Sequence, residues 1–329
     1  HIVYFTRKYN LQFNCWDKFS FRFTRMINHN GHVRDFTDID YIWKMFQEKK
    51  FLKSRQYSDS CSIALENLNL RKSGSTDRWV TKTQLDNFDK NCKAKKYRNF
   101  QRKTILICSN VPFDAGYDKI TTIFPSMGEW LVKTVEYLLS KYKNIDLIIR
   151  AHPDEQRYKA KTTTQTLIDK IKLNKSNVNV YSGLGVNTYD LIDKMHLGIV
   201  FSSTVGLEMA MLGKKVLLGS EVYYSKKGFT IDPKNSNEYF NLLDFHINSK
   251  ESVISKIKAY KAQFYHYLLH STLMPFPFDK PSGIQKINAQ EFFKNGIVNN
   301  FKETFDSLSM NDQEWKINIK SNINNKVIL

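Results

Sequence analysis

The feature that most constrains the fold is a regular alternation of short apolar runs and helical periods between Thr104 and Leu218. The apolar runs have the length of buried strands. Strands that alternate with helices in this way call for a parallel sheet with right-handed crossovers. The expected strands are Thr104–Ser109, Ile145–Arg150, Val178–Tyr181, Leu197–Phe201 and Lys215–Leu218.

Helical periods separate these strands. In the first, Leu131, Val135 and Leu138 recur at a spacing that places them on one buried helix face. Gly213 stands where the glycine after a helix belongs, directly before the last strand. The expected helices are Ser126–Tyr142, Thr163–Leu173, Thr188–Met195 and Val205–Leu212, followed after the sheet by Ser236–Asp244 and Ser252–Leu269. The pattern predicts an α/β, Rossmann-like domain over residues 104–278.

The two flanks lack this alternation. Residues 1–103 form a shorter, helix-rich region, with helices expected at Trp16–Ile27 and Ile39–Phe51 and a weak strand signal at Ile2–Thr6. In residues 279–329 the sequence pattern predicts further short helices, followed by a frayed tail rich in Asn and Lys. We therefore expect three parts, with boundaries near residues 103 and 278.

The chain is strongly basic. It carries 50 Lys and Arg residues against 32 Asp and Glu, a formal net charge of +18. The sequence has no Arg-rich stripe and no zinc-finger spacing, so we expect no nucleic-acid partner. Lysines on solvated helix faces, an anionic membrane surface and acidic glycans all stay open as explanations of the charge.

Cysteine and acidic residues give no sign of a metal site. The four cysteines are far apart and form no Cys-x-x-Cys pair, which favours reduced thiols in a cytosolic protein. We interpret the Asp-x-Asp pair at Asp38 and Asp40 as a solvated helix start, and expect no metal and no cofactor. No apolar run approaches the roughly 18 residues that a membrane-spanning helix needs.

Polar residues follow the second expected strand. Arg150 and His152 are two residues apart, a spacing that points both side chains to the same side of an extended segment. Arg grips phosphate in bidentate fashion and His donates a hydrogen bond to a phosphate oxygen. The alternative is an Arg paired with Asp154 or Glu155 beside a solvated His.

A second polar group follows the fourth strand, where open α/β sheets bind ligands. Ser202, Ser203 and Thr204 open a helix, and their hydroxyls would face an anion. Gly206 in the first turn would let a ligand approach the backbone, and Glu208 would accept hydrogen bonds from sugar hydroxyls. The alternatives are a simple helix cap and a carboxylate placed near a helix start.

Two loops add candidates. Asp114, in the loop after the first strand, is a candidate general base, and the alternative is an Asp that stabilises a turn. Lys227, in the loop after the last strand, would close over a bound ligand, and the alternative is a solvated side chain.

Four blocks, taken in this order, resemble the capsule polysaccharide biosynthesis glycosyltransferase family, whose members are similar to bacterial transferases that use CMP-activated Kdo or sialic acid. The blocks are Phe124–Leu131, Leu147–Glu155, Ser202–Val216 and Tyr224–Pro233. The resemblance covers roughly residues 104 to 278. It implies a GT-B architecture of two Rossmann-like domains, with His152 and Ser202 to Thr204 on the donor nucleotide. Residues 1–103 would then be a short, incomplete acceptor-side half.

The resemblance implies a metal-independent glycosyltransferase. It would move a sugar from a nucleotide-sugar such as CMP-Kdo to a surface polysaccharide or glycolipid, with Arg150, His152 and the Ser202 to Thr204 segment offsetting charge on the leaving phosphate. The enzyme would be cytoplasmic and peripheral at the inner membrane face, held there by the basic connector Lys90–Lys103. A GT-B-like epimerase, a glycerol-phosphate-type polymerase and a non-catalytic polysaccharide-binding protein stay open as alternatives.

Overall fold

The computed structural model describes residues 14–19, 22–27, 37–47, 51–73, 102–111, 123–157, 159–182, 186–272 and 274–275. The chain forms two compact units. One contains residues 1–71, 75–86 and 264–329, and the other contains residues 72–74 and 87–263. Residues 264–278, which the sequence pattern assigns to the sheet domain, therefore group with the amino-terminal region.

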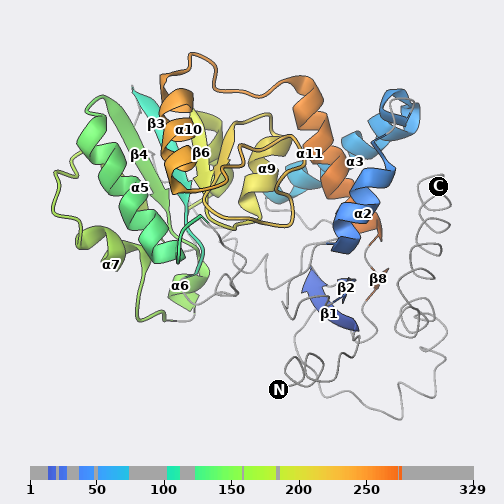
Figure 1. Cartoon of the computed structure of the whole chain (residues 1–329), viewed down its shortest axis with the longest axis horizontal. Helices are drawn as coiled ribbons and strands as arrows, with labels where there is room; N and C mark the ends of the chain where they lie inside the picture. The colour runs from blue at the N-terminus through green and yellow to red at the C-terminus, as the bar shows by residue number, and fades with distance from the viewer. Residues whose placement is uncertain are drawn as a thin grey trace, which may run out of the picture. The chain divides into compact units, whose positions relative to one another are not determined.

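The second unit contains a five-stranded parallel sheet with the order β5-β4-β3-β6-β7, of which β4, β3 and β6 are labelled in Figure 1. Its strands are β3 (Lys103–Cys108), β4 (Ile145–Arg150), β5 (Val178–Tyr181), β6 (Leu197–Val200) and β7 (Val216–Leu218). The predicted parallel α/β sheet is thus confirmed, and each expected strand lies within a residue or so of its predicted bounds.

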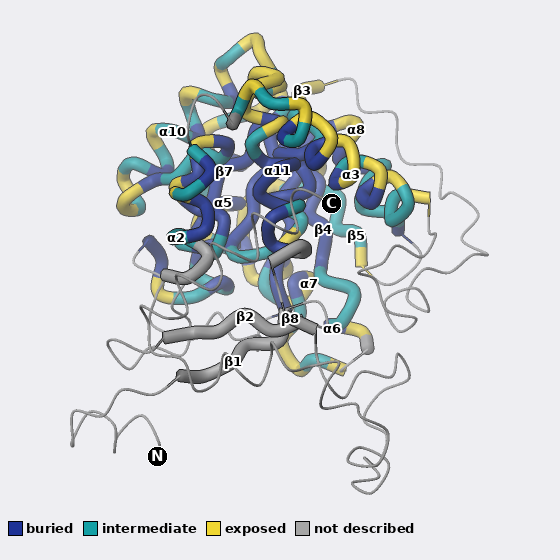
Figure 2. The backbone as a smooth tube through the Cα atoms, turned by 90° about the vertical axis from the view of Figure 1, so that its right-hand side faces the viewer, coloured by how far each residue is buried: buried dark blue, intermediate teal, exposed yellow. Residues whose placement is uncertain are grey.

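Helices on one face of the sheet build the main core. These are α5 (Met127–Lys141), α7 (Thr164–Asp169) and α10 (Ser236–Asn248). Ser126 caps α5 by accepting a hydrogen bond from the backbone N–H of Glu129 at 3.1 Å. Fully buried α5 side chains such as Trp130 and Leu131 pack with alternate residues of the strands. In Figure 2, β4 is dark blue along its length and the edge strand β5 is teal, as expected from their positions in the sheet.

The opposite face is covered by α8 (Thr188–Lys194) and α9 (Val205–Met211). Gly198 in β6 makes this packing close, because a Cβ there would meet the sulfur of Met209 at 2.6 Å and the methyl of Met195 at 3.0 Å. The short α6 (Asp154–Arg157) follows β4, and α11 (Lys256–Thr272) follows α10. All of the helices expected between Ser126 and Leu269 exist, with shifted ends for α7, α10 and α11.

The first unit contains a small antiparallel sheet with the order β1-β2-β8. Its strands are β1 (Asn14–Phe19), β2 (Arg22–Ile27) and β8 (Met274–Pro275). The predicted helix at Trp16–Ile27 is wrong, because β1 and β2 form an antiparallel pair there.

Helices α2 (Thr37–Met45) and α3 (Arg55–Lys72), the 3-10 turn η1 (Phe51–Lys53) and the end of α11 from Phe264 onward also belong to this unit. Aromatic side chains hold them together, with the ring of Trp43 edge-on to Tyr265 at 5.3 Å and Tyr57 against Phe264 at 4.9 Å. The Asp-x-Asp pair lies in the first turn of α2, as expected of a helix start. The sequence pattern missed α3, whose apolar residues show little helical segregation.

Several predictions lie outside the described residues. These are the strand Ile2–Thr6, the loop with Asp114, most of the connector Lys90–Lys103 and the tail 279–329. None of the described helices is both long enough and apolar enough to cross a bilayer.

Candidate functional site

The order of the sheet strands locates the candidate site. The chain runs from β3 outward through β4 to β5, and then returns to β6 on the other side of β3. The direction of winding therefore reverses between β3 and β6, and the carboxyl ends of these two strands flank the crevice where open α/β sheets bind ligands. Asn110 follows β3 and Ser202 follows β6.

A hydrogen bond joins the two sides of this switch point. The backbone N–H of Ser202 donates to Oδ1 of Asn110 at 3.1 Å. The Asn110 side chain is buried, with 8% of its surface exposed. Asn110 thus fixes the start of the Ser202 to Thr204 segment to the end of the central strand.

The Ser202 to Thr204 segment is also held from the other side. The hydroxyl of Tyr224 donates to the carbonyl oxygen of Ser203 at 2.5 Å. Thr204 precedes α9 but makes no side-chain capping bond. None of the three hydroxyl groups has a hydrogen-bond partner within the described part of the chain, and all three residues are at least partly exposed. The backbone is fixed, and the hydroxyls stay available to a ligand.

Gly206 is closely packed against protein side chains. It is buried, and a Cβ at this position would meet the hydroxyl oxygen of Tyr224 at 2.3 Å and Cγ2 of Val200 at 2.8 Å. A protein side chain therefore approaches this backbone in the direction of a Cβ, and the approach of a ligand to Gly206 stays a prediction. Because Gly206 has no Cβ, the Tyr224 side chain has room to reach the carbonyl oxygen of Ser203.

Glu208 lies on the buried side of α9, with 9% of its surface exposed. Its Oε2 accepts a hydrogen bond from the hydroxyl of Tyr189 in α8 at 3.1 Å. The carboxylate therefore already has a protein partner, and a sugar hydroxyl would have to share or replace the contact with Tyr189.

His152 follows β4 and is about one-third exposed. Its Nδ1 accepts a hydrogen bond from the backbone N–H of Asp154 at 3.2 Å. Because Nδ1 is an acceptor, the proton of the neutral ring is on Nε2. The imidazole is thus oriented by its own turn, with Nε2 as its donor.

Arg150, two residues before His152, is buried, with 5% of its surface exposed. Its guanidinium donates to the carbonyl oxygens of Ala151 at 2.9 Å, Tyr181 at 3.3 Å and Val186 at 3.3 Å. Nε donates to the hydroxyl of Thr188 at 3.2 Å. Arg150 therefore links the ends of β4 and β5 to the start of α8. In all of these contacts the acceptor of its N–H groups is an oxygen of the protein.

A second polar network, near Arg150, is formed around Glu155. Glu155 accepts hydrogen bonds from the backbone N–H of Thr164 at 3.0 Å and from its hydroxyl at 2.6 Å, and that hydroxyl lies 2.7 Å from Ser109 Oγ. Burial raises the pKa of Glu155, while its bonds to Thr164 and the charge of Arg150 oppose the shift. The network connects the loops after β3 and β4.

Cys108, the last residue of β3, is a free, fully buried thiol. Burial raises its pKa to about 12, although the nearby charge of Arg150 favours the thiolate. Since the thiolate is the nucleophilic form, Cys108 is a packing residue.

Lys227 lies in the loop after β7 and is buried, with 8% of its surface exposed. Its Nζ donates to the carbonyl oxygen of Ser225 at 3.0 Å. Asp232 organises the same loop by accepting from the backbone N–H of Lys226 at 3.1 Å and from the hydroxyl of Thr230 at 3.0 Å. In this arrangement Lys227 holds the loop together.

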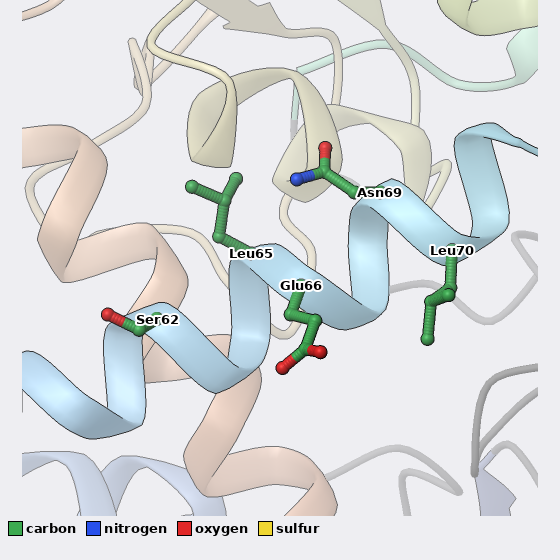
Figure 3. Close-up of a pocket in the computed structure, with 5 residues that line it drawn as sticks. All are labelled: Ser62, Leu65, Glu66, Asn69 and Leu70. Carbon is green, nitrogen blue, oxygen red and sulfur yellow. The ribbon is translucent and has the colours of Figure 1, made fainter.

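Two surface hollows are lined by residues outside the predicted site. One, of about 380 Å³, runs along α3 in the first unit and is lined by Ser62, Leu65, Glu66, Asn69 and Leu70 (Figure 3). The other, of about 680 Å³, lies between α5, the end of α7 and α10. Within the described ranges, no group of three or more His, Cys, Asp and Glu side chains is arranged to hold a metal ion.

Three residues outside the predicted site set hold predicted site residues in place. They are Asn110, Tyr189 and Tyr224. Two of them carry a signal in the sequence, since Asn110 directly follows an expected strand and Tyr224 opens the last of the four blocks. Tyr189 carries no such signal, and α8 brings it to the site.

A family model matches most of the chain. The model of the capsule polysaccharide biosynthesis protein family matches residues 35–276 of the chain. The chain belongs to the capsule polysaccharide biosynthesis family. The matched range of this capsule-family protein includes the whole parallel sheet and every described residue of the candidate site. No curated protein sequence matches the chain.

Solved structures give distant likenesses to this capsule-family chain. Two are Thermosulfurimonas dismutans KpsC transferases. The beta Kdo 2,7 transferase is 16% identical with a TM-score of 0.40, covering 80% of this chain and 67% of its own. The beta Kdo 2,4 transferase is 15% identical with a TM-score of 0.46, covering 78% and 73%. An S. aureus MnaA–UDP structure is 12% identical with a TM-score of 0.35, covering 62% and 50%. These TM-scores are too low to carry an argument about function.

Proposed function

We propose that this capsule-family chain is a glycosyltransferase of the GT-B type that binds a nucleotide-sugar at the carboxyl edge of the parallel sheet. The observation that carries the proposal is the polar group at the switch point. There, three hydroxyls that have no hydrogen-bond partner among the described residues lie on a backbone that Asn110 and Tyr224 fix. Membership of a capsule polysaccharide biosynthesis family supports a sugar-phosphate ligand for such a site.

The second part of the site is His152. It follows β4, two strands away from β6 across β3, and two strand spacings amount to about 10 Å. A nucleotide with its phosphates spans this length. We assign the Ser202 to Thr204 segment and the Nε2–H of His152 to opposite ends of the phosphate-bearing part of the donor.

The proposed chemistry places hydrogen-bond donors where negative charge develops. As the bond between the sugar and the phosphate breaks, charge builds on the leaving phosphate oxygen. Donors that are already oriented stabilise this charge without reorganisation. His152 and the three hydroxyls supply such donors, and Arg150 acts indirectly by fixing the end of β4, which carries His152.

The remaining parts of the reaction are proposals from the family resemblance. Asp114, outside the described residues, is the candidate base for the acceptor hydroxyl, and the acceptor is a surface polysaccharide or glycolipid. We propose that the reaction needs no metal ion and takes place at the cytoplasmic side of the membrane. A role of Glu208 toward the sugar requires Tyr189 to yield its hydrogen bond.

The test is donor use by the full chain and two variants. CMP-, UDP- and GDP-sugars are offered with a lipid-linked or oligosaccharide acceptor, and both products are identified. His152→Ala and the double variant Ser202→Ala/Ser203→Ala should each lower kcat/KM for the accepted donor by about 100-fold or more, because oriented donors to a developing charge are lost. Ser140→Ala, an exposed change on α5, is the matched control.

Two results would overturn the proposal. One is full turnover in a correctly folded His152→Ala variant. The other is a product that is an isomerised nucleotide-sugar, without transfer to any acceptor, which would identify an epimerase.

A further inference from the structure

Exposed large apolar side chains concentrate at the beginning of α11. Val253 is 54% exposed, Ile257 71% and Tyr260 48%. Single exposed apolar residues are normal on a protein surface, but three within one short segment form a feature that needs an explanation. Ile257 and Tyr260 are three residues apart in α11 and therefore lie on the same helix face.

Lysines surround these apolar side chains. Lys250, Lys256 and Lys258 are exposed, and Lys261 is partly exposed. Glu251 is the single acidic residue between positions 250 and 261, so this segment carries a net charge of +3. We call the set Lys250, Val253, Lys256, Ile257, Lys258 and Tyr260 the basic apolar surface.

The surface has a fixed position in the second unit. Val253 forms a β-bridge with Lys214, and the backbone N–H of Ile254 donates to the carbonyl oxygen of Gly213 at 2.8 Å. Gly213 and Lys214 precede β7, so the basic apolar surface lies at the amino edge of the sheet. The candidate site lies at the carboxyl edge, and the two are therefore separable by mutation.

The loop that leads to α11 is held by two lysines from the sheet. Lys103 Nζ donates to the carbonyl oxygens of Ile247 at 2.8 Å and Ser249 at 3.0 Å. Lys215 Nζ donates to the carbonyl oxygen of Glu251 at 2.8 Å. The exposed apolar side chains are thus presented by an anchored segment.

We propose that the basic apolar surface binds an anionic lipid membrane. Ile257 and Val253 would enter the boundary between headgroups and acyl chains, and Tyr260 would lie at headgroup level. The lysines next to these apolar residues would contact the anionic phosphates of the surrounding lipid headgroups. Lys is depleted in protein–protein interfaces, which makes a lipid surface the better match than a protein partner. This inference goes beyond the proposed function and does not depend on it.

The test is binding of the full chain to vesicles in a sedimentation assay. Vesicles of phosphatidylcholine with phosphatidylglycerol should retain the wild-type protein at low salt, and added salt should weaken the binding because exposed charges are screened. Vesicles of phosphatidylcholine alone should bind it poorly. Lys256→Gln/Lys258→Gln and Val253→Ser/Ile257→Ser should each weaken binding to the anionic vesicles by about tenfold or more.

Lys172→Gln/Leu173→Ser is the matched control, since it removes one exposed lysine and one exposed apolar side chain elsewhere on the same unit. It should bind as the wild type does. Wild-type affinity in both surface variants would overturn the proposal, and so would the absence of wild-type binding. Concentration-dependent dimers that only Val253→Ser/Ile257→Ser abolishes, without vesicle binding, would assign the surface to self-association instead. Turnover of a soluble acceptor, measured without vesicles, tests the enzyme separately.

Discussion

The backbone N–H of Ser202 donates a hydrogen bond to Oδ1 of Asn110 at 3.1 Å, across the point where the strand order of the sheet reverses. The two residues are far apart in the sequence and become neighbours only because β6 returns to the side of β3. This bond makes the position of the Ser202 to Thr204 segment depend on one buried amide.

Replacing that amide should lower both the stability of the fold and the affinity for the ligand. Asn110→Ala leaves the Ser202 N–H without this acceptor, which we expect to cost about 1–3 kcal/mol in the free energy of unfolding. Nucleotide-sugar binding should weaken as well, while Asn110→Asp, which keeps an acceptor oxygen, should lose less of both. Urea unfolding and calorimetry measure the two effects, with exposed Asn174→Ala as the control. Unchanged binding in a folded Asn110→Ala variant would contradict this role.

Arg150 should contribute mainly to the stability of the fold. Arg150→Ala removes bonds to three carbonyl oxygens and leaves Glu155 buried without the nearby positive charge. We expect a loss of about 3 kcal/mol or more, because a buried charge then lacks compensation. Urea denaturation checks this, and Arg55→Ala, whose side chain is 94% exposed, should change stability little. An Arg150→Ala variant that keeps wild-type stability but loses donor binding would instead favour direct contact with the donor.

Gly206 and Tyr224 should be energetically coupled. Gly206→Ala places a Cβ against the Tyr224 hydroxyl, and we expect a loss of about 1–3 kcal/mol from overpacking. Tyr224→Phe removes that hydroxyl together with its bond to Ser203. The double variant should therefore cost less than the sum of the single changes, as a double-mutant cycle measures. Simple additivity would show that the close contact is not what excludes a side chain here.

Metal removal should leave transfer activity unchanged. The proposed site stabilises the leaving phosphate with His152 and hydroxyl donors of the protein. Activity is measured for the full chain before and after treatment with EDTA, with a manganese-dependent transferase as the positive control for chelation. Loss of activity in EDTA that manganese restores would show that a metal ion takes part.

Histidine protonation should destabilise the fold in mild acid. Burial lowers the pKa of His266 to about 3 and that of His246 to about 4, from a usual value of 6.5. The unfolded chain therefore binds protons first as the pH falls below 6.5, so the free energy of unfolding decreases from there toward the folded-state values. A fully buried histidine contributes up to about 1.4 kcal/mol per pH unit.

Urea unfolding at a series of pH values measures this slope. Burial raises the pKa of Glu155 and Asp232, and these carboxyl groups oppose the trend at the acidic end. The comparison of the wild type with His266→Phe isolates the imidazole, since the variant should show the weaker dependence. Equal slopes in the two proteins would mean that His266 is protonated in the folded state.

The strands and helices of the second unit could be predicted because each is encoded locally. Apolar runs such as Ile145–Arg150 fit only a buried strand, and Ser126 and Gly213 mark the ends of neighbouring helices. The hairpin of β1 and β2 shows the limit of this approach. The sequence predicts a helix at Trp16–Ile27, but pairing between the two strands decides the structure.

The sequence by itself determined a parallel α/β sheet with polar residues at two strand ends, because strand length, helical period and capping are properties of neighbouring residues. The tertiary structure decided what those polar residues do. In the folded protein Arg150 is buried among carbonyl oxygens and Tyr224 packs against Gly206. Glu208 accepts a hydrogen bond from Tyr189. Each of these contacts joins residues from different elements, and a side chain's partners depend on how the elements pack, which no local pattern specifies.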